Sequence, residues 1–164
     1  MSFLRVLLAL AIALAVQAGL GLLWPESYRF VDVMIVPVVW FGINGSQRTA
    51  MLVGCAAGLL QDAWFHLGVF GLNGFKKTLL GWTLGGLGSR FDVNRQGGRM
   101  LFGVLASLAD SLLDFGLRQL LDQQETAIRP TDILIKAVVT GLLVAIVFAL
   151  TERVRGRRST RYMA

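Results

Sequence analysis

Seven ionisable side chains lie in or beside the apolar stretches of this sequence, and we call them the polar cluster. They are Asp62, His66, Lys76, Lys77, Asp110, Asp114 and Lys136. A charged group in hydrocarbon is costly, so such residues face a protein interior or a wet cavity. Two interpretations are open. The charges could pair and fix neighbouring helices in register, or they could line an outward-facing cavity that binds a solute or relays protons.

The residue types argue against a catalytic or metal centre. The chain has one histidine and one cysteine, so these side chains cannot assemble a zinc-type ligand set. His66 lies four residues after Asp62, but a lone Asp–His pair without a nucleophile is weak evidence for catalysis. Cys55 lies in an apolar run and is expected to be a small packing residue. The sequence therefore predicts a protein that is not an enzyme, with no cofactor and no metal.

Composition places the cluster in a membrane protein. The chain has 164 residues, of which 55% are hydrophobic and only 16% charged, whereas about a quarter of an average soluble domain is charged. Runs of about twenty apolar residues are long enough to cross a bilayer. Six helices are predicted, with short loops between them, at Phe3–Leu23, Val31–Ile43, Arg48–Phe65, Gly71–Leu87, Met100–Leu121 and Ile133–Leu150. The second is short for a span and contains Pro37, which predicts a kinked or tilted helix.

The distribution of basic residues predicts the orientation. Lys and Arg favour the cytoplasmic side in short loops. With the N-terminus inside, the inner segments carry ten arginines and the outer loops three, and six spans return the C-terminus to the cytoplasm. We expect a transmembrane domain over 1–151 and a basic cytoplasmic tail over 152–164, with the tail near anionic lipid headgroups and not on nucleic acid.

This orientation places the polar cluster in the outer half of the bilayer. Asp110 and Asp114 share a helix face because they are four residues apart. Asp62 lies about one turn from the outer end of its helix, and Lys76 and Lys77 lie at a similar depth on the helix that returns. We therefore expect Asp62 to pair with a base on that helix.

Two glycine pairs predict close helix contacts. Gly54 and Gly58 are four residues apart, as are Gly81 and Gly85. Small residues at this spacing let helix backbones approach closely in membranes. These faces could pack within this chain or receive a partner's helix, and the spacing does not choose between the two.

The stretch "GCAAGLLQDAWFHLGVFGLNGFKKTLLGWTLGGLGSRF" resembles the rod shape-determining protein MreD family. The residues that carry the resemblance are Gly54, Gly58 and Asp62, then Leu67, Gly68, Gly71 and Leu72 in the bend, then Gly81, Gly85 and Arg90. The motif covers about forty residues, while length and helix count agree over the whole chain.

The resemblance implies a non-enzymatic, multi-pass protein of the bacterial inner membrane that acts in cell elongation, rod shape and peptidoglycan synthesis. Its implied partners are the transmembrane helix of MreC, the RodA and class B penicillin-binding protein complex, and the MreB filament through the cytoplasmic face. The alternative is a substrate-binding membrane subunit of a small-solute (vitamin) transporter, because the family is similar in size and helix count to such subunits of energy-coupling-factor transporters. A transporter predicts a solute-sized cavity lined by the polar cluster, whereas a scaffold predicts that these side chains pair with one another.

Overall fold

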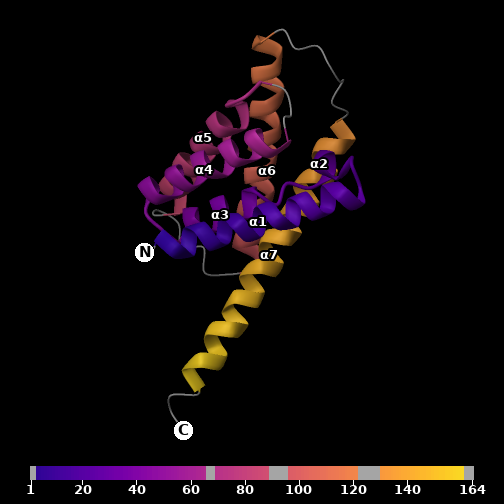
Figure 1. Cartoon of the computed structure of the whole chain (residues 1–164). Coiled ribbons are helices and arrows are strands. Elements are labelled where there is room, and N and C mark those ends of the chain that lie inside the picture. Colours follow the sequence, from indigo (N-terminus) through magenta and orange to yellow (C-terminus); the bar gives the residue numbers. More distant parts are fainter. Residues whose placement is uncertain (1–2, 66–68, 89–95, 122–129, 161–164) are drawn as a thin grey trace.

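The computed structural model describes residues 3–65, 69–88, 96–121 and 130–160, and every regular element in these ranges is a helix. The elements are α1 (Phe3–Leu23), α2 (Ser27–Phe30), α3 (Ile35–Asn44), α4 (Gln47–Phe65), α5 (Leu72–Gly88), α6 (Gln96–Leu120) and α7 (Pro130–Thr160) (Figure 1). The predicted all-α class is confirmed, and the six predicted helices correspond to α1 and α3 to α7. The short α2 is an addition that the sequence pattern did not indicate.

Helix α3 forms the centre of the bundle and contacts α1, α4, α5, α6 and α7. It begins at Ile35, not at Val31, and the Oδ1 of Asp32 accepts a hydrogen bond from the backbone N–H of Met34 at 3.0 Å. Pro37 is consequently the third residue of the helix. Its missing N–H falls in the first turn, where no intrahelical acceptor is available. Pro37 therefore helps to start α3 and does not lie at an interior break. The predicted kink or tilt of this helix stays a prediction.

The apolar core surrounds this short helix. The start of α3 contributes most of the core, and α1, α4, α5, α6 and α7 supply the rest. The buried core residues include Leu10, Ala13, Met34, Ile35, Val36, Val38, Val39, Phe41, Val53, Ala57, Leu84, Ala106, Val144 and Phe148. Because α3 is buried on almost every side, its sequence is apolar from Ile35 to Ile43 and has no polar face. The helices α1, α4, α5, α6 and α7 therefore pack around α3.

Helix α1 lies across the outside of the bundle (Figure 1) and buries only a narrow stripe of its surface, at Leu10, Ala13 and Gln17. Gln17 holds the chain that leads into α3. Its Nε2 donates to the backbone carbonyl of Val31 at 3.2 Å, and its Oε1 accepts from the N–H of Val33 at 2.7 Å. This amide thus satisfies backbone groups that no helix satisfies, just before Asp32.

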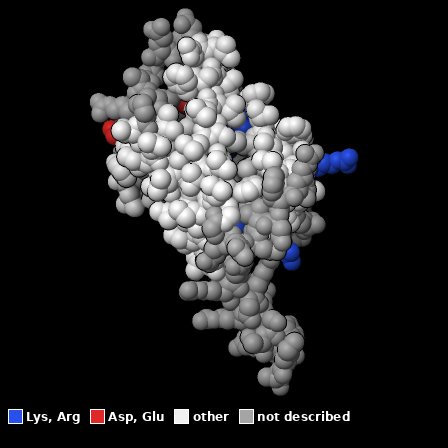
Figure 2. All heavy atoms as spheres, turned by 180° about the vertical axis from the view of Figure 1, so that it is seen from behind, with Lys and Arg blue, Asp and Glu red and all other residues white. Residues whose placement is uncertain are grey.

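Within the described ranges, three helical segments are long and apolar enough to cross a membrane, namely Phe3–Leu23, Gly98–Leu120 and Thr131–Thr151. On the face shown in Figure 2 the described surface is almost entirely free of acidic and basic side chains, as expected where lipid is the solvent. Helix α7 continues to Thr160, so the residues that follow the last span extend it away from the bundle (Figure 1).

Candidate functional site: a buried network of charges

Lys77 on α5 is the centre of a buried network of charges. Its side chain is fully buried, and its Nζ donates to Oδ2 of Asp32 at 2.7 Å. The same Nζ lies 3.6 Å from Oδ1 of Asp110 on α6. The other oxygen of Asp110 accepts a hydrogen bond at 3.1 Å from Lys136 on α7. The order Asp32, Lys77, Asp110, Lys136 alternates in sign and joins the start of α3 to α5, α6 and α7.

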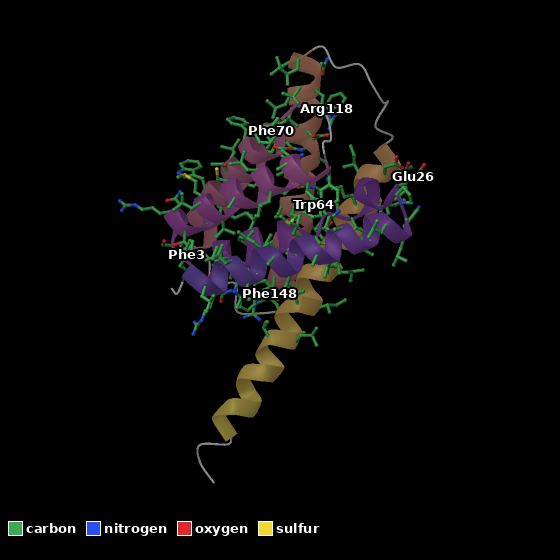
Figure 3. The ribbon with its side chains drawn as sticks, viewed as in Figure 1. Phe3, Glu26, Trp64, Phe70, Arg118 and Phe148 are labelled. Atoms are coloured by element: carbon green, nitrogen blue, oxygen red, sulfur yellow. The ribbon has the colours of Figure 1, made fainter. Side chains whose placement is uncertain are left out.

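The neighbouring lysine pairs separately. Nζ of Lys76 lies 2.6 Å from Oδ1 of Asp114, and Nε of Arg118 lies 2.8 Å from Oδ2 of the same carboxylate. Arg118 and Asp114 are four residues apart on α6, the spacing at which side chains on one helix face meet. Asp114 is therefore held by one base on its own helix and one on α5. Figure 3 labels Arg118 near the C-terminal end of α6.

The charges of this buried network balance. In Asp32, Lys77, Asp110 and Lys136 two formal negative charges meet two positive ones, so the group is neutral. A buried ion pair gains little over an apolar packing of the same volume, but removing one partner leaves an uncompensated charge at a cost of about 3–5 kcal/mol. We therefore expect the network to favour one arrangement of α3, α5, α6 and α7 over others.

Asp62 has a different role from the predicted one. Its carboxylate accepts hydrogen bonds from the N–H groups of Gly71 at 3.0 Å and Gly74 at 3.1 Å, and from Nδ2 of Asn73 at 2.7 Å. The expected pairing with a lysine is wrong. Gly71 precedes the first residue of α5 and has no side chain to cap it, so Asp62 supplies the acceptor from α4. A negative charge there also interacts favourably with the helix dipole.

Some residues of the predicted site cannot be placed, and two residues of the network were not predicted. His66 lies outside the described residues, as do Leu67, Gly68 and Arg90 of the motif. Asp32 and Arg118 were missed as members of the network. Asp32 is an acid within a predicted apolar span, and this alone could have drawn attention to it. Arg118 could have been found from its spacing to Asp114.

The glycine pairs face each other within the chain. A Cβ placed on Gly54 would overlap the backbone carbonyl of Lys77, and one on Gly58 would overlap that of Asn73. On the facing helix, a Cβ on Gly81 would overlap the carbonyl of Ala50, and one on Gly85 would lie 2.7 Å from Cα of Gln47. Both pairs therefore form the α4–α5 contact. Of the two possibilities left open by the sequence, the structure favours internal packing.

The opposite end of the bundle is joined by an aromatic contact. The guanidinium of Arg99 on α6 lies 5.0 Å from the ring centroid of Phe148 on α7, and this ring lies 4.4 Å from that of Trp40 on α3. A cation over an aromatic face is attracted by the ring quadrupole. Figure 3 shows Phe148 well separated from Arg118, so the charge network and this contact hold α6 and α7 at different levels.

The arrangement as a whole supports pairing more than chemistry. The acids of the network each face a base or a helix N-terminus, and within the described residues no group of three or more His, Cys, Asp or Glu could hold a metal ion. The pairing alone explains the directions of these side chains, so no solute-binding cavity has to be assumed.

The family model described as rod shape-determining protein MreD matches residues 1–154 of the chain. No curated protein and no solved structure matches.

Proposed function

Because the chain belongs to the rod shape-determining protein MreD family, with the match covering residues 1–154, we propose that it is a non-enzymatic inner-membrane scaffold of the bacterial cell-elongation machinery. The family gives the role in rod shape determination. What the scaffold proposal adds is the manner of action: the chain binds other proteins of the machinery and holds them in the membrane, and it transforms no substrate.

The observation that carries the proposal is the pairing within the polar cluster. Lys76, Lys77, Asp110, Asp114 and Lys136 form ion pairs with one another or with Asp32 and Arg118. In the transporter alternative these side chains would instead present their charges to a solute. Stripping paired charges apart for each binding event would cost several kcal/mol. The paired state therefore supports a scaffold over a solute-binding subunit.

The burial pattern of α4 and α5 supports a multi-pass arrangement. Neither helix is among the three long apolar segments. Their polar and small residues nevertheless face inward, among them Gln61, Asp62, Lys76 and Lys77. Large apolar side chains face outward, namely Leu52, Leu59, Leu60, Trp64, Phe75, Leu79 and Trp82. A helix pair with polar groups inside and apolar groups outside suits a lipid environment, so we infer that α4 and α5 also cross. With the short α3 as a sixth span, both termini of the chain lie in the cytoplasm.

The proposed partners follow from the family, and the structure bears on where they bind. The transmembrane helix of MreC is the proposed direct partner, with RodA, the class B penicillin-binding protein and, through the cytoplasmic face, the MreB filament as further members of the assembly. The glycine faces of α4 and α5 are filled by each other. A partner helix therefore binds on the outward apolar surface of the bundle, among the membrane lipids.

The test is recovery of the tagged full-length chain from its native membrane in mild detergent, with mass spectrometry of the proteins that accompany it. The proposal expects MreC and the peptidoglycan synthase pair. Recovery of an ATPase pair with a coupling membrane subunit would instead support the transporter alternative. Expression of the chain in rod-shaped cells depleted of their own copy should restore rod shape, and failure to do so with normal membrane levels would contradict the proposal.

A further inference from the structure

Four buried side-chain oxygen atoms on α6 and α7 have no hydrogen-bond partner within the described part of the chain. They are Oγ of Ser107, Oδ1 of Asp110, Oγ of Ser111 and Oγ1 of Thr140. The first two residues and Thr140 are entirely buried, and Ser111 is 6% exposed. Burying one polar group without a partner costs about 1–3 kcal/mol, so four of them together would be a large defect in a bundle of this size.

Helix register brings these atoms to one place. Ser107, Asp110 and Ser111 are separated by three and four residues and so share one face of α6. Thr140 lies one turn from Lys136, whose Nζ reaches Asp110. Val144, which lies one turn beyond Thr140 on α7, packs against Gly103 of α6. Because the two helices run antiparallel between these two contacts, Thr140 lies about level with Ser107.

We propose that this polar seam, formed by Ser107, Asp110 and Ser111 of α6 and Thr140 of α7, binds water molecules that bridge the hydroxyl groups to Oδ1 of Asp110. A water molecule can donate to the carboxylate oxygen, which only accepts, and can still accept from a hydroxyl. Buried waters typically make about three hydrogen bonds to groups of this kind.

Two other occupants fit less well. The all-oxygen donor set could suit an alkali cation, but Lys77 lies 3.6 Å from Oδ1 of Asp110 and Lys136 lies 3.1 Å from Oδ2. A cation would add a positive charge beside two ammonium groups. Alternatively, each hydroxyl could bond the carbonyl one turn back in its own helix. That would leave Oδ1 of Asp110 without a donor, so it does not account for the full set.

The seam has a defined end. Below Ser107 and Thr140 the two helices close tightly, since a Cβ on Gly103 would lie 2.9 Å from Cβ of Val144 and one on Gly141 would overlap the side chain of Val104. The bound water is thus confined to the half of the bundle that contains the charge network. There it solvates Asp110, which carries two ammonium partners but has one oxygen beyond hydrogen-bond distance of either.

The test is a thermodynamic cycle on the full-length chain in detergent, with Ser107→Ala, Thr140→Val and the double variant, each followed by thermal unfolding. A bridging water predicts that each single change lowers the melting temperature. It also predicts that the double variant falls by clearly less than the sum, because both hydroxyls hold the same water. The control is Thr151→Val, whose hydroxyl bonds the carbonyls of Val147 and Phe148 within α7.

The other outcomes are distinct. Higher or unchanged melting temperatures in both single variants would mean dry, unpartnered hydroxyls and would overturn the proposal. Strictly additive losses equal to that of Thr151→Val would indicate intrahelical bonds and would also overturn it. Melting in sodium chloride and in N-methylglucamine chloride should agree. A stabilisation specific to sodium that disappears in Thr140→Val would replace water with a cation.

Discussion

Two faces of the same helix, α5, meet the rest of the bundle in opposite ways. The glycine face, with Gly74, Gly81 and Gly85, packs against α4 so closely that an added methyl group would meet α4 atoms. The lysine face, with Lys76 and Lys77, reaches acids on α6 and before α3. The first contact depends on the absence of side chains and the second on long side chains with matched charges. Close backbone packing thus holds α5 against α4, and matched charges hold its other face against α6 and the start of α3.

The two faces of α5 should therefore respond differently to substitution. The glycine face tolerates no added volume, because backbone atoms cannot move aside. The lysine face tolerates changes in charge only if they are balanced, because the penalty comes from the unpaired partner and not from the loss of the pair itself. The predictions below follow this distinction, from the largest expected effect to the smallest.

Gly58→Leu should prevent folding of the α4–α5 pair. Its Cβ would overlap the backbone carbonyl of Asn73, and the rest of the leucine has no space. The measurement is the yield of monodisperse protein on size exclusion in mild detergent. The matched control is Gly116→Leu on α6, where an added Cβ meets nothing within 4 Å. Equal yields for the two variants would show that the glycine face is not closely packed.

Lys77→Met should lower the free energy of unfolding by about 3–5 kcal/mol, because it leaves Asp32 without its ammonium partner in a buried setting. Methionine approximates the length of the lysine stem, so the loss reports charge more than volume. Unfolding of the purified chain in a denaturing detergent titration would measure it. A variant as stable as the parent would mean that the lysine face carries no buried charge.

Asp62→Ala should lower the free energy of unfolding by about 1–3 kcal/mol, since it leaves the N–H groups at the start of α5 without their acceptor. Asp62→Asn keeps one acceptor oxygen and should lose less. The same titration applies. If Asp62→Asn were as damaging as Asp62→Ala, charge and not hydrogen bonding would be the main contribution of this residue.

Arg118→Gln should have the smallest effect, about 1 kcal/mol or less, because exposed ion pairs contribute little and this one is partly exposed. The side chain of Arg118 is 27% exposed, and Asp114 retains Lys76 at 2.6 Å. The melting temperature of this variant should lie close to that of the parent. A loss as large as that of Lys77→Met would mean that Arg118 is a full member of the buried network.

The sequence could predict the helices because a span has a characteristic length and composition. Helix α4 was expected from Arg48 and begins at Gln47, and α5 was expected from Gly71 and begins at Leu72. Helix α3 was harder, because ten apolar residues are too short for a typical span. Its burial on nearly all sides is a tertiary property that no local pattern contains.

The partners within the network could not be predicted, since residue spacing gives depth along a helix but not the direction of the side chain relative to another helix. Lys76 and Lys77 are adjacent in sequence, yet successive residues point about 100° apart on a helix, and the two lysines bind different acids. Asp62 lies in the last turn of α4, as expected, but its carboxylate faces the start of α5. Asp32 was missed because it lies at the edge of a predicted span.

The central claim is that the buried charges act by pairing with one another. The most direct test compares Lys77→Met with the double variant Asp32→Asn, Lys77→Met, in rod-shaped cells depleted of their own copy. The double variant leaves Asp110 paired with Lys136, and asparagine can still accept from the N–H of Met34. We predict that Lys77→Met lowers the membrane level of the protein and gives rounded cells, and that the double variant restores both. A double variant as defective as Lys77→Met would contradict the account, because Lys77 would then be needed for itself and not for its partner.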